Sequence, residues 1–524
     1  MRFTELEYLV EIFARDADDV FGAVAQLNSV SFIEWAAANT VSEPVLHGQT
    51  VPARENIPGQ HHVGNPGQTP GAPVVLVDDE YFPRQWHLHN TGQSGGTAGA
   101  DINAPEAWAI TAGDPNIIVA VQDTGVDLNH PDLADNLVPG YDFFDNDDSP
   151  NPELDAGFLE GHGTACAGLV AAEGDNGIGV AGVAYKCKVM PIRDMTWNQA
   201  VTEADKAEAI RWSAANGADI MSYSWGYRTP RPIIHSAIKD VVRPGGIGRG
   251  GKGCVVVVAA GNSAGAMPSG DTAAYPEVIA VGATDHNDRR CWYSVYGPAI
   301  DIVAPGGGAV EGEDLSLQEN VESYMLLSTD LIWTTDMTGY MGFSTFNDNP
   351  HLLDYTAKMF GTSAAAPIAA GVAALILSVD GDLTSADVRS ILLGSARDLG
   401  AAGWDEYYGH GRVDARAALE MALNPLRCVP GDFDGDSDID FEDFAIFGIH
   451  WRQLGCSEEN NCRSGADLAP EIPDGVVNAL DLAVFAENWL VDVIIYKKEC
   501  EYCESGAPLS ACSDTDGAAA LFPK

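Results

Sequence analysis

The sequence predicts an α/β fold in which a parallel β-sheet is covered by helices on both of its faces. Short, nearly continuous apolar segments recur through the middle of the chain, and helical segments, amphipathic or built from small residues, separate them. Strands buried on both faces of a parallel sheet lack the apolar–polar alternation of a one-sided sheet. Polar residues flanked by glycine follow several of these segments, at the carboxyl ends of strands where such sheets hold their active sites.

The chain is expected to begin with a small unit and a linker. Residues 1–46 form the unit, with strands at 8–14 and 31–36 around a helix at 16–27 whose first turn is acidic. Residues 47–77 are rich in proline, glycine and histidine without periodicity, which is typical of a linker.

The central unit, residues 78–424, carries the apolar strands and the helices between them. Its expected strands cover residues 117–122, 189–193, 219–224, 255–260 and 278–283, with helices that begin at His162, Glu203 and Ile233. Residues 306–355 are expected to form a long irregular insertion that shapes access to the site. Two further helices, at 385–396 and 414–423, precede a change of composition at Cys428.

Composition limits the class of protein. A length of 524 residues indicates two or more domains, and 76 acidic against 28 basic residues give a formal net charge of −48. Such a charge repels nucleic acids and anionic membranes, so neither is expected as a partner.

No stretch approaches the ~18 apolar residues of a membrane span. No signal peptide is visible after Met1, so we expect the signal of a secreted form to lie upstream. Most carboxylates are expected at the surface. Their large number fits a protein from a salt-rich habitat and a protein that is merely soluble equally well.

Three polar residues mark the ends of elements. Asp123 follows the strand at 117–122, His162 opens a small-residue helix within Gly-His-Gly-Thr, and Ser363 precedes a buried helix within Gly-Thr-Ser-Ala-Ala-Ala-Pro. Alone, the histidine would be a core residue and the serine a helix cap. Together they occur in the order Asp, His, Ser, one of the known orders of a catalytic triad. Histidine can take the serine proton and a buried carboxylate can orient the histidine, so the sequence predicts nucleophilic catalysis.

A fourth polar residue follows the strand at 255–260. Asn262 lies between Gly261 and Ser263, where asparagine is often only a turn residue. Beside a nucleophilic serine, its side-chain amide would donate to an oxyanion together with the backbone N–H of Ser363. We therefore predict that Asn262 is an oxyanion donor.

These residues resemble a known family. Four segments are similar to the signature blocks of the subtilisin-like serine peptidases, family S8: Asp123-Thr124-Gly125, His162-Gly163-Thr164, Ala260-Gly261-Asn262 and Gly361-Thr362-Ser363-Ala364-Ala365-Ala366-Pro367. The resemblance covers residues 78–423 and implies a three-layer α/β/α fold and endopeptidase activity through an acyl-enzyme. It implies the roles of nucleophile, general base, orienting acid and oxyanion donor for Ser363, His162, Asp123 and Asn262.

Some details resemble the kexin-type branch of that family, namely His162-Gly163-Thr164-Ala165-Cys166-Ala167-Gly168, Gly182-Val183-Ala184-Tyr185 and Ser222-Tyr223-Ser224-Trp225-Gly226. Arg228 and Arg231, however, stand where that branch carries acidic residues for a basic substrate side chain. The β-rich domain that follows its catalytic unit is also missing. Dibasic cleavage is therefore not predicted.

The resemblance also implies a substrate-binding strand formed by Ser224, Trp225 and Gly226, which pairs with an extended peptide. Core packing is an equal alternative for the tryptophan side chain. Cys166 is expected to be a buried thiol behind His162, because nothing in the sequence marks it as activated.

The same resemblance implies a calcium-binding site. Asp132 and Asn176 match the family's high-affinity calcium site, in which backbone carbonyls, here those of Gly174, Ile178 and Val180, complete the ligands. The alternative is an aspartate and an asparagine in ordinary turns. The unit at 1–46 is similar to the end of the family's prodomain, which assists folding and then blocks the cleft; an unrelated cap is the alternative.

Acidic residues recur in a twelve-residue loop near the carboxyl terminus. The ligand positions 1, 3, 5, 7, 9 and 12 are filled by Asp432, Asp434, Asp436, Asp438, Asp440 and Asp443. An apolar helix at 444–451 follows, which disfavours a plain acidic linker. Ser437 replaces the usual glycine, and Asp443 replaces the bidentate glutamate.

A second copy of this pattern lies at 473–482, and its ligands would be Asp474, Asn478 and Asp481. Pro470 and Ile472 occupy its first two ligand positions, so an insertion or a degenerate loop is required, with Asp467 as a substitute. Two loop–helix copies resemble a dockerin-type module at 428–495. That family implies calcium-dependent folding and docking to a cohesin-like or cell-surface partner.

Six of the ten cysteines crowd into the end of the chain, namely Cys428, Cys456, Cys462, Cys500, Cys503 and Cys512. Such clustering is typical of an oxidising compartment, and six cysteines allow 15 pairings, so we predict disulfides without assigning them. Cys500 and Cys503 form one Cys-x-x-Cys in the tail at 496–524, where a disulfide is favoured over zinc.

The sequence as a whole predicts a secreted, calcium-dependent serine endopeptidase that acts on proteins or peptides. The competing hypothesis is a binding or adhesion protein whose peptidase domain is inactive. Four intact blocks favour the enzyme, whereas loss of Ser363 or Asn262 would have favoured the binding protein.

Overall fold

A computed structural model describes residues 45–46, 74–153, 161–196, 200–308, 331–339, 342–344 and 353–423. The chain divides into two compact units. The first comprises Met1–Arg389 and Ala396–Arg416 and holds most of the described residues, and the second comprises Ser390–Ser395 and Ala417–Lys524. The backbone N–H of Val75 donates to the carbonyl oxygen of Pro105 at 2.9 Å, so this residue contacts the first unit.

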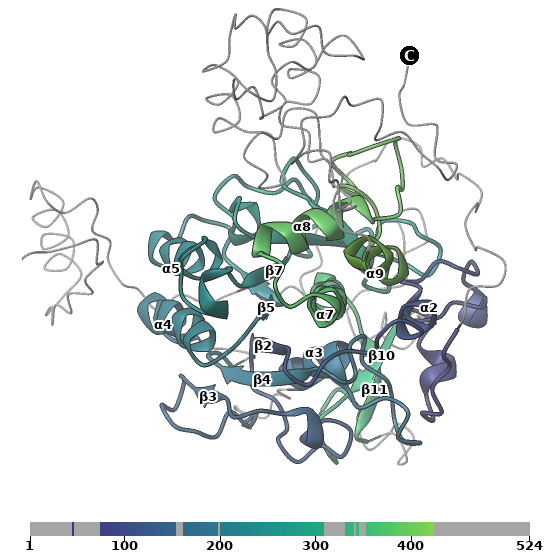
Figure 1. The fold of residues 1–524 in the computed structure, drawn as a ribbon, viewed down its shortest axis with the longest axis horizontal. Coiled ribbons are helices and arrows are strands. Elements are labelled where there is room, and N and C mark those ends of the chain that lie inside the picture. Colours follow the sequence, from purple (N-terminus) through teal and green to yellow (C-terminus); the bar gives the residue numbers. More distant parts are fainter. Residues whose placement is uncertain are drawn as a thin grey trace, which may run out of the picture. The chain divides into compact units, whose positions relative to one another are not determined.

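A parallel seven-stranded sheet forms the centre of the first unit, with the strand order β3-β4-β2-β5-β7-β8-β9 (Figure 1). Its strands are β2 Ile118–Asp123, β3 Tyr141–Asp142, β4 Lys188–Arg193, β5 Ile220–Tyr223, β7 Val255–Ala259, β8 Ile279–Thr284 and β9 Ile302–Pro305. The register pairs Val121 of β2 with Pro191 on one side and Ser222 on the other. These strands are buried nearly throughout, which confirms the predicted fold class.

Helices cover the two faces of this sheet. Figure 1 shows α3 His162–Ala171 and α7 Thr362–Val379 on one face, and α4 Glu203–Ala215 and α5 Pro232–Val242 on the other. The remaining helices are α2 Ala104–Trp108, α8 Ser385–Gly394 and α9 Ala415–Leu423, with 3₁₀ turns at Phe82–Arg84, Gln93–Gly95, Ala134–Asn136, Arg249–Gly251 and Thr272–Ala274.

Local chemistry fixes where these helices begin. The Thr202 hydroxyl accepts from the backbone N–H of Asp205 at 3.2 Å and caps α4, and a proline stands at the first position of α5. The α7 helix begins with Thr362, so Ser363 lies in its first turn instead of before it. Among the described residues α7 is long and apolar enough for a membrane span, but 89% of it is buried inside the protein.

Two short antiparallel pairs flank the main sheet. Strand β10, Ile332–Thr335, pairs with β11, Tyr355–Met359, next to α3. The expectation of an irregular insertion at 306–355 is therefore wrong for residues 332–335. Strand β1, Val45–Leu46, pairs with β6, Trp225–Gly226.

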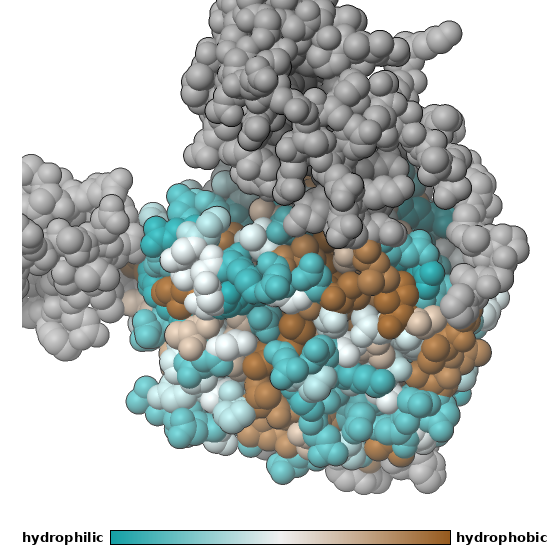
Figure 2. Space-filling model, viewed as in Figure 1, coloured by the Kyte–Doolittle hydropathy of each residue, from teal (hydrophilic) through white to brown (hydrophobic). Residues whose placement is uncertain are grey.

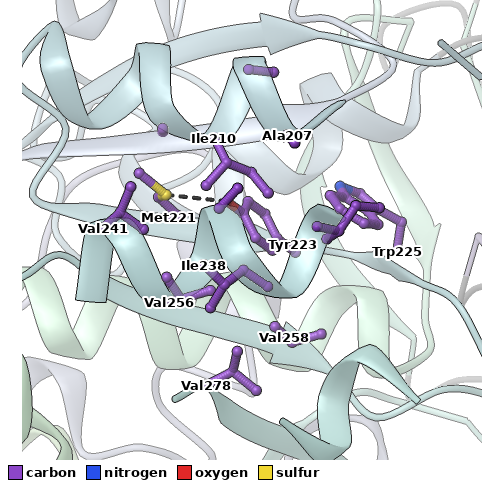
Figure 3. Packing of buried hydrophobic residues seen from close by; sticks show 14 of the residues in the cluster. Ala207, Ile210, Met221, Tyr223, Trp225, Ile238, Val241, Val256, Val258 and Val278 are labelled. Carbon is purple, nitrogen blue, oxygen red and sulfur yellow. Dashed lines mark hydrogen bonds between the residues drawn. The ribbon is translucent and has the colours of Figure 1, made fainter. Parts of the chain in front are cut away.

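The core between the sheet and α4 and α5 is shown in Figure 3. Ile210 of α4 and Ile238 of α5 pack with Met221 and Tyr223 of β5, and the Tyr223 hydroxyl donates to Met221 Sδ at 3.1 Å. This layer fixes β5 and β7, and with them the residues that follow the two strands. The surface in Figure 2 mixes hydrophilic residues with smaller hydrophobic groups.

Candidate active site

Asp123 is the last residue of the central strand β2 and is 1% exposed. Its Oδ1 accepts from the backbone N–H of Thr124 and from His162 Nδ1, each at 2.7 Å. Its Oδ2 is buried and has no hydrogen-bond partner. A carboxylate in this position can orient an imidazole ring and favour its charged form.

His162 opens α3 and is buried above the end of β2. Burial opposes protonation of the ring, but the charge and hydrogen bond of Asp123, together with the neighbouring Cys166, hold the pKa of His162 well above its ordinary value. With Nδ1 bonded to the carboxylate, Nε2 is the nitrogen left to exchange protons, and it is buried without a hydrogen-bond partner.

Ser363 lies in the first turn of α7 and is also buried. Its Oγ donates to the backbone carbonyl of Ser224 at 3.3 Å, while the Ser363 carbonyl accepts from Ser224 Oγ at 2.9 Å. Ser363 is thus held against the end of β5, and its hydroxyl is not hydrogen-bonded to His162 Nε2.

Asn262 follows β7 and is 3% exposed. Its Oδ1 accepts from the backbone N–H and from the hydroxyl of Thr362, each at 3.0 Å. These bonds fix the orientation of the amide, and its Nδ2 is buried without an acceptor. The sequence did not point to Thr362 as the residue that orients Asn262, because its role depends on how α7 meets the end of β7.

Ser224, Trp225 and Gly226 lie together at the carboxyl end of β5. The Trp225 side chain is fully buried and its Nε1 donates to Gln122 O at 2.8 Å, so the side chain is part of the core. The backbone of Trp225 and Gly226 pairs antiparallel with Leu46 and Val45. The side chain of Trp225 therefore packs in the core, and substrate binding by the backbone of this strand stays a prediction.

This arrangement of Asp, His, Ser and Asn coincides with a family match. Residues 114–411 match the family described as "Peptidase_S8: Subtilase family", which is more than half of the chain. The chain belongs to the subtilase family.

Individual relatives agree with this subtilase assignment. The chain is 34% identical over 366 residues to the "Calcium-dependent protease" of Trichormus variabilis, covering 65% of this chain and 52% of the relative. It is 32% identical over 319 residues to "Thermitase" of Thermoactinomyces vulgaris, covering 61% of this chain and 94% of the relative. The chain thus spans about half the length of the first of these relatives.

A solved structure shares the subtilase fold. A protease from Pseudoalteromonas arctica superposes with a TM-score of 0.53 at 30% sequence identity, and the superposition covers 67% of this chain and 100% of the other.

Cys166 lies behind the histidine of this subtilase. Its Sγ is 3.9 Å from His162 Nδ1 and 3.4 Å from Ser224 Oγ, and burial raises the pKa of the thiol. A protonated, buried thiol is a poor nucleophile, as the sequence predicted. The ligand atoms of Asp123, His162 and Cys166 lie within 4.8 Å of one another, so a metal ion held there would compete with the Asp123–His162 bond.

Asp132 and Asn176, the predicted calcium ligands, lie side by side. Asn176 Nδ2 donates to Asp132 Oδ1 at 2.8 Å, and the backbone N–H of Val180 donates to Asp132 Oδ2 at 2.9 Å. Burial raises the pKa of Asp132 to about 7, with Asp79 and Glu173 adding negative charge nearby. Gly179, at φ +58°, lies directly against the Asp132 carboxylate, because a Cβ there would be 2.3 Å from Asp132 Oδ2. A residue with a side chain would not fit at this position.

Asp79 is a member of this cluster that the sequence analysis missed. Its Oδ2 accepts from the backbone N–H of Asp175 at 2.8 Å, and its buried Oδ1 has no hydrogen-bond partner. The two buried carboxylates offer oxygen atoms of the hard type that calcium prefers, so they fit the ion. Asn176 presents its amide nitrogen to Asp132, and its Oδ1 accepts from the backbone N–H of Ile178 at 2.9 Å, so the amide would have to rotate to offer its oxygen. The acidic run Asp78-Asp79-Glu80 at the start of the ordered unit was the available signal.

The other predicted sites lie outside the described residues. These are the calcium loops with Asp432, Asp434, Asp436, Asp438, Asp440, Asp443, Asp474, Asn478 and Asp481, the dockerin-like module and the six clustered cysteines. The four described cysteines, Cys166, Cys187, Cys254 and Cys291, are buried.

Proposed function

We propose that this subtilase is a serine endopeptidase that cleaves protein or peptide substrates through an acyl-enzyme. Ser363 is the nucleophile, His162 the general base and Asp123 the orienting acid. The observation that carries the proposal is the 2.7 Å bond between Asp123 Oδ1 and His162 Nδ1, which leaves Nε2 as the proton acceptor beside the serine helix.

The residues account for each proton. Ser363 Oγ attacks the carbonyl carbon of the scissile bond while its proton passes to His162 Nε2. The C–N bond then breaks, and the histidine returns this proton to the leaving amine, so that the acyl group stays on Ser363. Water then attacks the ester carbonyl carbon while its proton passes to Nε2. The C–O bond to Ser363 breaks, and Nε2 returns this proton to Ser363 Oγ.

Asn262 supplies electrostatic stabilisation in this scheme. Its Nδ2 is a buried amide donor without an acceptor, and Thr362 holds the amide through Oδ1. We propose that Nδ2 and the backbone N–H of Ser363 both donate to the oxyanion. A fixed donor costs no reorganisation when the charge develops, and such a donor is worth about 10²–10³ in kcat in a member of this same family.

The substrate would bind along Ser224, Trp225 and Gly226 as an added antiparallel strand. The pairing of Val45–Leu46 with Trp225–Gly226 supports this mode, because a segment of the chain itself lies there in strand register. We propose that residues 1–46 are a partial prodomain whose last residues cover the substrate strand until they are removed.

Calcium is proposed to bind at Asp79, Asp132 and Asn176. The ion would neutralise the two buried carboxylates and join the segment before the 3₁₀ turn Phe82–Arg84 to the turn at 175–180. The Trichormus relative carries calcium dependence in its name, which agrees with this proposal. The loops at 432–443 and 474–481 are proposed as further calcium sites of a dockerin-like module with a cohesin-like or cell-surface partner.

Secretion is proposed from cysteine usage, because six cysteines gather in the last part of the chain while the described cysteines are buried thiols.

The experiment is covalent labelling with a fluorophosphonate, which reacts with an activated serine. We expect labelling of the wild type, no labelling of Ser363→Ala, and unchanged labelling of Ser378→Ala, whose serine lies on the same helix and donates to Ala374 O within it. A chelator should abolish labelling, and added calcium should restore it.

The opposite outcome has a clear meaning. If neither the full chain nor a form that starts at residue 75 is labelled with calcium present, the enzyme proposal fails. The protein would then be a binding protein on a peptidase scaffold.

A further inference from the structure

The pairing of β1 with β6 defines how a peptide runs past the nucleophile. Val45 lies opposite Gly226 and Leu46 opposite Trp225, so the paired segment runs antiparallel to β6 toward Ser224. A peptide bound in the same register has its next residue opposite Ser224, whose backbone carbonyl is 3.3 Å from Ser363 Oγ. This is the residue whose carbonyl group meets the serine, and we call it the P1 residue.

Two chain segments leave the sheet next to the position of the P1 residue. One continues from β6 through Tyr227 to Arg228, and the other continues from β7 through Asn262 to Ser263. The segments run side by side, because β5 and β7 are parallel neighbours in the sheet. Arg228 closes the space between them: its Nη1 donates to Ser263 Oγ, one residue beyond the proposed oxyanion donor.

The charge of Arg228 is not neutralised by an ion pair with any described carboxylate. Its hydrogen-bond partner, Ser263, is neutral. Asp271 is affected by the guanidinium charge, but it is buried and accepts from the backbone N–H of Ala273 at 3.1 Å instead. A guanidinium without a carboxylate partner beside a substrate side chain is free to bind an acceptor from that side chain.

The neighbouring Arg231 provides a contrast. It forms an ion pair with Glu203 at 2.7 Å, and its guanidinium carbon lies 4.7 Å from the centre of the Tyr227 ring. The charge of Arg231 is thus neutralised by Glu203, and its guanidinium group packs on the Tyr227 ring. Of these two arginines, Arg228 is therefore the one with charge available to a ligand.

We propose that Arg228 makes the P1 site selective for acidic side chains and unfavourable for lysine and arginine. The inference rests on the proposed function and names the substrate class of that same site. An aspartate or glutamate at P1 can accept charge-assisted hydrogen bonds from the guanidinium, whereas a cation there meets a like charge.

The test compares three peptides that differ only at P1, with Glu, Gln or Lys. With the full chain in calcium, we expect kcat/KM to be about tenfold higher for Glu than for Gln, on the scale of one charge-assisted hydrogen bond, and lowest for Lys. Arg228→Gln should make Glu and Gln equal, and Arg228→Glu should reverse the order of Glu and Lys.

The matched control is Arg243→Gln, which removes one positive charge from a side chain that is 66% exposed at the end of α5. It should leave all three ratios unchanged. Ser263→Ala keeps the charge but frees the guanidinium, so the preference for Glu over Lys should persist. Ratios in Arg228→Gln that equal those of the wild type overturn the inference.

A second measurement separates this inference from the proposed reaction. Peptides that end in Glu, Gln or Lys are titrated into full-length Ser363→Ala and followed by fluorescence anisotropy, with and without Arg228→Gln. Competition from residues 45–46 lowers every affinity by the same factor and cancels in the ratios. A Glu preference that depends on Arg228 supports the inference even if no peptide is cleaved, and equal affinities overturn it.

Discussion

At the scale of single residues, a buried ion pair supports both β2, which ends with Asp123, and β6. Lys206 Nζ lies 2.8 Å from Asp194 Oδ2, and both side chains are fully buried. The same ammonium lies 3.7 Å from the centre of the Trp225 ring. Gln122, next to the triad aspartate, donates to Asp194 and accepts from Trp225 through its backbone carbonyl. The pair therefore ties the end of β2 to β6, and we consider Lys206 a positioning residue.

Removal of one partner should be costly. Lys206→Met leaves Asp194 as an unpaired buried charge, and we expect a loss of about 3–5 kcal/mol in the free energy of unfolding, measured by urea denaturation. The double variant Lys206→Met/Asp194→Leu should recover most of this loss, because no charge is then buried alone. A loss below about 1 kcal/mol in the single variant would show that water reaches the pair. In the double variant, a higher KM with unchanged kcat would show that the pair positions the substrate strand.

At the scale of elements, the start of α3 is pressed against the end of β2. A Cβ on Gly163 would lie 2.2 Å from Gly125 O and 3.1 Å from Asp123 Cβ. The glycine thus allows the close approach that brings His162 to Asp123. The pattern His-Gly-Thr is explained by this packing, which no spacing rule in the sequence reveals.

Gly163→Ala should move the first turn of α3 away from β2. We expect a loss of at least about 100-fold in kcat, since a displacement of 1 Å at a catalytic group can cost this much, and a loss of about 1–3 kcal/mol in stability from overpacking. Gly168→Ala is the matched control, because its Cβ would meet Thr335 Oγ1 at 2.1 Å on the β10 side of the same helix. Equal losses of kcat in the two variants would refute a specific role of Gly163.

At the scale of the whole molecule, a buried histidine makes folding sensitive to acid. His87 is fully buried, neither ring nitrogen has a hydrogen-bond partner, and burial lowers the pKa of His87 to about 3. The unfolded chain takes up a proton near pH 6.5, whereas the folded protein excludes it until about pH 3. Stability should therefore fall as pH falls between these two values.

The variant His87→Met should remove this part of the acid sensitivity. Between pH 6.5 and 4.5, protonation of His87 in the unfolded chain should lower the free energy of unfolding of the wild type by about 2 kcal/mol, a loss that the variant does not show. Thermal or urea unfolding at several pH values in saturating calcium measures the difference. Above pH 7 the two curves should run parallel, because the histidine is neutral in both states. Parallel curves below pH 6 would contradict the low pKa.

The sequence by itself determined the fold class, most strand positions and the order of the four site residues. Nearly continuous apolar runs specify buried parallel strands, and the carboxyl ends of such strands meet at one edge, so Asp123 and Asn262 had to lie near each other. The start of α7 was less well determined, because the run of small residues around Ser363 fits a turn and a helix equally well.

Only the tertiary structure decided how distant segments meet. Asp79 joins Asp132, Thr362 orients Asn262, and Arg228 bonds Ser263, although each pair is far apart in the sequence. Strand β10 has the β-branched and aromatic residues of a strand, Ile332-Trp333-Thr334-Thr335, but only its antiparallel pairing with β11 shows which segment it joins. The spacing of apolar residues along the sequence indicates which face of a helix or strand is apolar. It does not record which polar groups from other segments will lie against that element, and this is decided when the sheet and its helices pack.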